Sequence, residues 1–366
     1  MKKLTRRMKR FKGLTVGLDL HKKFIQYSVL DARGNEVEGS RVEAKRGALL
    51  ELVRRLHKRG KVQVSLEACG TFYWVFDTLV EAVGRERVHA AHPGGMRAAT
   101  RSGEKSDATD AWWLAYLLWD GRLPQARPAE GQMRELRIVG REFHWHKQVR
   151  SDLFRRLRSH AAQAGLKLPA QWHTSKVKRG QVRELLRQVC GERGRAMKGL
   201  YLEALRLGKI VASWRQKLAE LCGAFEIVKL IQREIPGMKD TTCGLAFAEL
   251  GDPRSFRAAK SYANATGLTP KNQGTGGKQE RGGITRAGSP LSRWAYTTAV
   301  VACRRCKQGP GVCIKEWVAH RCQFKPKKKV ITAAGRKLAE GVWRLCALGE
   351  AFDLKRAFPA PKRKVS

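Results

Sequence analysis

The chain has 366 residues, 42% of them hydrophobic, which is enough for two or three domains with buried cores. Lysine and arginine number 74 against 32 acids, giving a net charge of +42. Such a field favours a polyanion, because each neutralised phosphate releases a counterion. It argues against a membrane partner, since no amphipathic anchor, signal peptide or transmembrane-length apolar run is found. Nine scattered cysteines are typical of reduced thiols in a cytoplasmic protein.

The first third of the chain alternates between β-like and helical patterns. After a basic arm at residues 1–13, we expect strands at Leu14–Leu20, Phe24–Leu30, Glu36–Val42, Val62–Leu66 and Arg87–Ala91. Helical spacing falls on Lys45–Arg59, Phe72–Val83 and a run from Asp107 to Gly121. The Gly-rich, basic stretch Pro93–Ser106 is predicted to be a loop. Strands that alternate with helices after an initial meander predict an α/β domain with a mixed sheet.

Four acids occupy places that such a fold could bring together. Asp19 lies near the end of the first strand and Glu67 at the end of a later one, while Asp107 and Asp110 share the first turn of a helix. Phosphodiester chemistry with two divalent metals needs such hard oxygen ligands, and Mg²⁺ suits them best, with Mn²⁺ as its substitute. Asp19 and Glu67 end apolar runs, where burial is costly without a partner. For Asp107 and Asp110, helix capping is the open alternative.

The middle of the chain is predicted to be helical. One stripe of large apolar residues has heptad-like spacing: Trp214, Leu218, Leu221, Phe225 and Val228. It suits either a dimerising arm or ordinary packing of one helix on another. His144 and His146 are two apart and do not face each other, which argues against a shared metal. Four later cysteines, Cys303, Cys306, Cys313 and Cys322, match the spacing of no known zinc ribbon or finger.

The last third is predicted to be mainly helical and strongly basic. A long glycine-rich loop is expected over Thr269–Pro290, and such loops are usually functional. Gln323–Val330 is a basic run before a last amphipathic helix near Ile331–Leu348. No Gly-Lys-Ser/Thr follows a strand as in a P-loop, so no nucleotide cofactor is expected.

Several of these stretches carry a resemblance. The order VGLDLHKK, SLEACGTF, EKSDATDAWWLA resembles the N-terminal DEDD, RuvC-like domain of the insertion-sequence transposases described as bridge-RNA-guided serine recombinases. The later IPGMKDTTCGLAFAELGDPRSF and TPKNQGTGGKQERGGITRAGSPLSRWA resemble the C-terminal domain of the same family. The likeness covers roughly Leu14–Gly121 and Ile235–Arg305, in the family's order.

The resemblance implies a fold and a site. It implies a ribonuclease-H-like N-terminal domain in which Asp19, Glu67, Asp107 and Asp110 coordinate Mg²⁺. It also implies a serine nucleophile in the Gly-rich loop, but the matching position here is Thr275, whose methyl group crowds an in-line approach. Three explanations stay open: Thr275 attacks, Ser289 serves instead, or the recombinase is impaired. Cations around this loop and in the later basic run would bind nucleic acid: Lys271, Lys278, Arg281, Arg286, Lys327, Lys328 and Lys329.

The expected protein is thus a prokaryotic, nucleoid-associated DNA transposase that acts on donor and target DNA. The resemblance further implies a structured guide RNA and a homo-oligomer, a dimer or a tetramer. The alternatives are a metal nuclease or junction resolvase that uses water, and a non-catalytic nucleic-acid-binding protein. The expected organisation is a basic arm, the RuvC-like domain, a helical arm, the C-terminal domain, and a basic helix and tail, at residues 1–13, 14–127, 128–233, 234–322 and 323–366.

Overall fold

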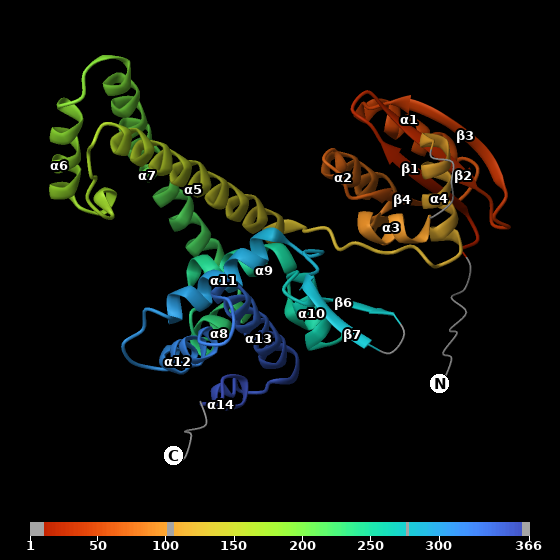
Figure 1. The fold of residues 1–366 in the computed structure, drawn as a ribbon. Coiled ribbons are helices and arrows are strands. Elements are labelled where there is room, and N and C mark those ends of the chain that lie inside the picture. Colours follow the sequence, from red (N-terminus) through yellow and green to blue (C-terminus); the bar gives the residue numbers. More distant parts are fainter. Residues whose placement is uncertain (1–10, 101–105, 276–277, 361–366) are drawn as a thin grey trace. The chain divides into compact units, whose positions relative to one another are not determined.

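The computed structural model describes residues 11–100, 106–275 and 278–360, of which residues 271–282 are described by their backbone only (Figure 1). The chain divides into two compact units, Met1–Pro128 and Ala129–Ser366. Each unit has its own hydrophobic core. No helix within the described ranges has both the length and the apolar character needed to cross a membrane.

The first unit is built on a five-stranded mixed sheet in the order β3-β2-β1-β4-β5. Its strands are β1 Leu14–Leu20, β2 Phe24–Leu30, β3 Glu36–Glu43, β4 Val62–Glu67 and β5 Val88–Ala91. β1 pairs antiparallel with β2 and parallel with β4, so it lies at the centre of the sheet. The five predicted strands are confirmed, with ends that differ by at most one residue, and the sheet is consistent with a ribonuclease-H-like fold.

Helices cover both faces of this sheet. They are α1 Arg46–His57, α2 Phe72–Val83, the 3₁₀ turn η1 Arg85–Arg87, α3 Pro93–Ala99 and α4 Asp107–Trp119. Val16 and Leu18 of β1 are buried in one core with residues of α1 and α2. Because successive side chains of a strand alternate between faces, Thr15, Gly17 and Asp19 lie on the opposite face, where α4 packs against β1.

The stretch after β5 corrects one prediction. Residues 93–99 form α3 and not the start of a loop. His92 caps this helix, because its Nδ1 accepts a hydrogen bond from the Gly95 amide at 3.2 Å, and Pro93 takes the first helical position, where its missing N–H costs nothing. Histidine is not among the usual N-cap residues, so the start of α3 was not recognised from the sequence.

The second unit is mostly helical. Its helices are α5 Gly131–Gln163, α6 Lys176–Arg187, α7 Gly191–Gly223, α8 Glu226–Glu234, α9 Asp240–Leu250, α10 Ala259–Ala265, α11 Pro290–Cys303, α12 Gly311–Cys322, α13 Lys327–Leu348 and α14 Leu354–Ala357, with 3₁₀ turns η2 Trp172–Thr174 and η3 Pro253–Ser255. α5 and α7 run side by side for much of their length (Figure 1). α6 begins at Lys176, after the 3₁₀ turn η2.

The heptad-like stripe packs inside the second unit. Leu218 and Val228 are fully buried, and Trp214, Leu221 and Phe225 pack against the same core. Ordinary helix packing therefore explains the stripe, and it is not a surface left for a second subunit.

The Gly-rich stretch is another correction. It was expected to be a loop, but its backbone forms a hairpin of β6 Pro270–Thr275 and β7 Lys278–Ile284. Within this hairpin, Gln273 pairs with Glu280 and Thr275 pairs with Lys278. Glycine content suggested a loop because glycine weakens the usual strand signal.

Candidate active site

The site is built at the ends of two parallel strands. Leu18 pairs with Leu66, so Asp19 and Glu67, the next residues on β1 and β4, come to the same edge of the sheet. Ser65 Oγ donates a hydrogen bond to the carbonyl of Leu114 on α4 at 2.8 Å, so this side of β4 faces α4. Glu67, two residues later, lies on that same face by strand alternation.

A close contact brings α4 to this edge. A Cβ atom at Gly17 would lie 2.0 Å from the carbonyl oxygen of Ala111 and 2.4 Å from the amide nitrogen of Ala115. The backbone of α4 therefore rests directly on β1, which only glycine allows. At the other end of α4, Trp119 Nε1 donates to the Ala32 carbonyl at 3.2 Å, which ties the helix to the β2–β3 turn.

The first turn of α4 carries the two remaining acids. Ser106 is its N-cap, with Oγ accepting from the Thr109 amide at 3.2 Å. The helix therefore begins at Asp107, and Asp107 and Asp110 share the turn nearest the end of β1. Neither is the N-cap, although both lie in the first turn, where the helix dipole favours acids.

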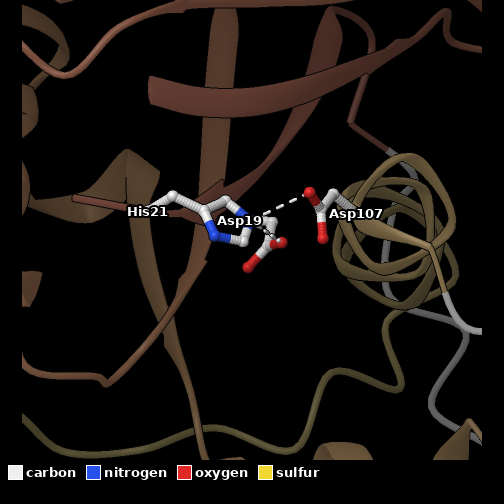
Figure 2. A group of neighbouring side chains, drawn as sticks. All are labelled: Asp19, His21 and Asp107. Atoms are coloured by element: carbon white, nitrogen blue, oxygen red, sulfur yellow. Dashed lines mark hydrogen bonds and ion pairs between the residues drawn. The ribbon is translucent and has the colours of Figure 1, made fainter. Parts of the chain in front are cut away.

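Asp19 and Asp107 converge on one side chain (Figure 2). His21 Nε2 lies 2.9 Å from Asp19 Oδ2 and 3.4 Å from Asp107 Oδ2. The ring of His21 stacks on Phe24 at 4.5 Å, which holds its plane. Asp19, His21 and Asp107 each offer a ligand atom, and these atoms lie within 4.8 Å of one another, close enough to hold one ion.

Burial and like charges act on Asp19. Desolvation raises the pKa of its carboxyl group, the neighbouring charge and hydrogen bond of His21 lower it, and the carboxylates of Asp110 and Asp107 raise it again. The influence of Asp110 places this acid in the same electrostatic cluster. Acids gathered in this way repel one another, and a cation relieves that repulsion.

His21 was not predicted as a site residue. The predicted strand ends at Leu20, so His21 falls just outside it, although its spacing of two from Asp19 allows both side chains to lie on one side. That spacing was the available signal.

The donor set fits a divalent metal. Asp19, Asp107 and the neighbouring Asp110 offer the hard carboxylate oxygens that Mg²⁺ and Mn²⁺ prefer, and the His21 imidazole is a ligand that Mn²⁺ accepts. The cluster is also partly open, since the side chain of Asp19 is 23% exposed and that of Asp107 is 52% exposed. An ion here would thus be reachable by substrate.

The predicted nucleophile lies in the other unit. Thr275 is the last residue of β6, and its side chain, with those of Lys271, Lys278 and Arg281, is not among the described side chains. Arg286 is exposed just after β7, in a left-handed conformation with φ of 53°. Lys327, Lys328 and Lys329 are exposed on the first turn of α13.

Ser289 has a structural role. It is the N-cap of α11, where its Oγ accepts from the Ser292 amide at 3.2 Å. The same hydroxyl donates to Glu249 Oε2 at 3.0 Å, and Arg141 Nε donates to Glu249 Oε1 at 2.8 Å. Its hydrogen bonds are satisfied within the fold, which weakens the case for Ser289 as the nucleophile.

The four cysteines weighed as zinc ligands do not meet. Cys303, Cys306, Cys313 and Cys322 are all described, and no three of them come within metal-binding distance. Burial raises the pKa of Cys303 to about 12, so this thiol stays protonated at neutral pH.

Two family models match the chain. Residues 16–165 match a model described as "Transposase", and residues 230–311 match one described as "Transposase IS116/IS110/IS902 family". The chain belongs to this transposase family. It has the family's N-terminal DEDD domain and its C-terminal domain, and it is therefore a phosphoryl-transfer enzyme of insertion sequences. A DEDD transposase implies a divalent metal, and the cluster at Asp19 is a candidate for its site.

Individual transposases are similar to this chain, two of them over nearly its whole length. A putative transposase, y4pF/y4sB, of Sinorhizobium fredii is 26% identical over 93% of this chain and 85% of its own length. A probable family 20 transposase of Pseudomonas aeruginosa is 26% identical over 90% of this chain and 96% of its own length. The transposase for insertion sequence element IS1328 of Yersinia enterocolitica is 30% identical over 32% of this chain and 36% of its own length.

Proposed function

We propose that this transposase cuts and rejoins DNA with Asp19, Glu67, Asp107 and Asp110 as the ligands of Mg²⁺. The observation that carries the proposal is the convergence of Asp19 and Asp107 on His21, with Asp110 beside them. When bound, a divalent ion would polarise the scissile phosphate and favour departure of the leaving oxygen.

His21 is proposed to orient the two carboxylates. Its Nε2 contacts Asp19 Oδ2 at 2.9 Å, and stacking on Phe24 fixes the orientation of the ring. Replacing such a supporting residue typically costs about 10- to 100-fold in metal affinity or activity. We expect a loss of this size in His21→Ala, and none in His57→Ala on the exposed face of α1. Equal cleavage by both variants would remove His21 from the site.

The hydroxyl of Thr275 is proposed as the nucleophile. Its oxygen would attack phosphorus, forming a threonine–phosphate ester while the bond to the 3′ oxygen breaks and that oxygen leaves with a proton. Attack by a new 3′ hydroxyl on the ester would reverse the linkage and rejoin the strand without ATP. Arg286 and the cations of the hairpin would stabilise charge on the phosphate.

The acid cluster is tested by strand cleavage of DNA that carries the element's ends. Asp19→Asn keeps the shape of the side chain but removes the charge, so we expect cleavage to fall about 100- to 1,000-fold while DNA binding persists. Asp120→Asn, at the opposite end of α4, is the matched control and should cleave normally. Cleavage by Asp19→Asn at the normal rate would reject the metal role.

The covalent step needs its own test. Wild-type protein should give a protein–DNA adduct that survives denaturation, Thr275→Ala should give none, and Thr275→Ser should restore it. The methyl group of threonine favours one rival, a metal nuclease that uses water. Metal-dependent cleavage that is unchanged in Thr275→Ala, with no adduct, would establish that rival.

Guidance by a structured RNA and assembly as a dimer or tetramer complete the proposal, for a protein that acts on the nucleoid in the cytoplasm. The charge of +42 supports a polyanionic partner. RNA transcribed beside the reading frame should co-purify with the protein, and that RNA should redirect insertion when its complementary loop is changed. Insertion that ignores the loop sequence would reject guidance.

A single protomer mass in light scattering of the complex would reject assembly.

A further inference from the structure

A groove lies between α5 and α7, in the second unit and apart from the acids. It has a volume of about 360 Å³. Arg150 of α5 lines one side, and the other is a stripe of α7 from Gly208 through Val211 and Ala212 to Arg215 and Gln216. The guanidinium of Arg150 lies close to this stripe, since a Cβ at Gly208 would be 3.6 Å from Arg150 Nη1, an ordinary van der Waals contact.

Two arginines line this groove, and Lys147 lies near them, without acids among the described residues that neutralise these three charges. Lys147 and Arg150 are three residues apart on α5, so they share a face, and Arg215 faces them from α7. Within the described parts of the chain, none of the three forms an ion pair. The nearby acid Glu220 already accepts from Gln216 at 3.1 Å and from Lys217 at 3.4 Å.

Arg150 is unusual among the described arginines. Its Nε is buried and has no hydrogen-bond partner in the fold. Its guanidinium lies 5.5 Å from the centre of the Phe154 ring, and Lys147 Nζ lies 4.3 Å from that of Trp294. Aromatic faces therefore hold these cations in place, while the donor of Arg150 stays unused.

The charges also act on one another. Burial lowers the pKa of the Lys147 ammonium, and the positive charges of Arg150 and Arg215 lower it further. Burial likewise lowers the pKa of Arg150. A half-buried cation with an unpaired donor and like-charged neighbours destabilises the folded state. A bound anion would neutralise these charges, so the cluster points to an anion-binding site.

We propose that this groove binds a phosphate group of a nucleic-acid strand. Guanidinium matches phosphate geometry better than any other side chain, and Arg150 and Arg215 reach the groove from two helices. Gly208 and Ala212 have small side chains, which leaves room on α7 for a phosphate to approach the two guanidinium groups. The inference goes beyond the proposed function, because it concerns binding and does not depend on the acids or on Thr275.

The salt dependence of binding tests this site in the full-length protein. Duplex DNA and single-stranded RNA of matched length are titrated with protein over a range of KCl. Log affinity falls as log salt rises, and each lost phosphate contact should make this negative slope shallower by about one unit. We expect this in Arg150→Met and in Arg215→Gln. Arg183→Gln, which removes an exposed charge from α6 outside the groove, should leave the slope unchanged.

The outcomes separate the sources of the phosphate. A shallower slope with only DNA or only RNA identifies the strand that the groove holds, and a shallower slope with both means that it accepts either. Unchanged slopes in Arg150→Met and Arg215→Gln overturn the proposal. An equal loss in Arg183→Gln also overturns it, since the effect would then be one of net charge. Arg215 is exposed, so its variant keeps the test valid if Arg150→Met fails to fold.

A second measurement uses inorganic phosphate alone. At constant ionic strength, phosphate should raise the melting temperature of the wild type above its value in chloride, because binding to the folded state stabilises it. Arg150→Met should lose this increment, and Arg183→Gln should keep it. The same increment in all three proteins would contradict a site in the groove.

Discussion

Gly17 of β1 and Ala111 of α4 touch backbone to backbone. A Cβ on Gly17 would lie 2.0 Å from the carbonyl oxygen of Ala111, well inside any allowed contact. Ala111 follows Asp110 directly, so this contact fixes how close the first turn of α4 lies to the end of β1. The acid cluster therefore depends on a residue that carries no functional group.

Gly17→Ala should damage both stability and site. Overpacking of this kind costs roughly 1–3 kcal/mol, and relief requires α4 to move away from β1, which separates Asp107 and Asp110 from Asp19. We expect a lower free energy of unfolding in denaturant titration and a loss of strand cleavage. Gly47→Ala is the matched control: α1 has open space there, and alanine favours helix by up to about 1 kcal/mol. Full activity in Gly17→Ala would show that α4 tolerates the shift.

Ser289→Ala should cost stability but not the covalent adduct. Loss of an N-cap costs about 1 kcal/mol, and Glu249 would lose one of its donors. If Thr275 is the nucleophile, the adduct persists in Ser289→Ala. Ser289→Asn restores the cap without restoring a hydroxyl. An adduct that is absent from both variants, although Ser289→Asn is as stable as wild type, would make Ser289 the nucleophile.

Glu38 predicts a dependence of stability on pH. Hydrogen bonds from Arg55 and Tyr27, together with Arg59, hold the pKa of its carboxyl group at about 2, below the usual 4.5. Because the folded-state pKa is the lower one, this stabilisation is fully present above pH 4.5 and is lost as pH falls towards 2.

The prediction is checked by replacing Glu38. Allowing for solvent screening at this surface site, Glu38→Gln should lower the free energy of unfolding at pH 7 by about 1 kcal/mol. The variant should also lose less stability than wild type between pH 5 and pH 3, as followed by denaturant titration. Parallel pH curves for the two proteins would show that Glu38 does not contribute.

The sheet was predictable and the packing between elements was not. Alternating apolar runs placed β1 and β4, and their parallel register then brought Asp19 and Glu67 to one edge. The hairpin of β6 and β7 was missed because its glycines remove the side-chain pattern on which strand prediction depends.

Two groups of side chains could be recognised only from the folded structure. His21 is two residues from Asp19 in the sequence, but its contact with Asp107 depends on the packing of α4 on β1. Lys147 and Arg150 are ordinary basic residues three apart on α5, and only the packing of α5 against α7 makes Arg215 their neighbour. The net charge indicates a polyanionic partner, but its proposed binding site can be located only from the packing of helices that are far apart in the sequence.

Binding of Mn²⁺, followed by its electron paramagnetic resonance signal with and without donor-end DNA, tests the metal site most directly. Wild-type protein should bind the ion, and Asp19→Asn and Asp107→Asn should each weaken binding at least about tenfold. Asp120→Asn should bind as wild type does. Equal affinity in all four proteins would contradict the assignment of Asp19 and Asp107 as metal ligands.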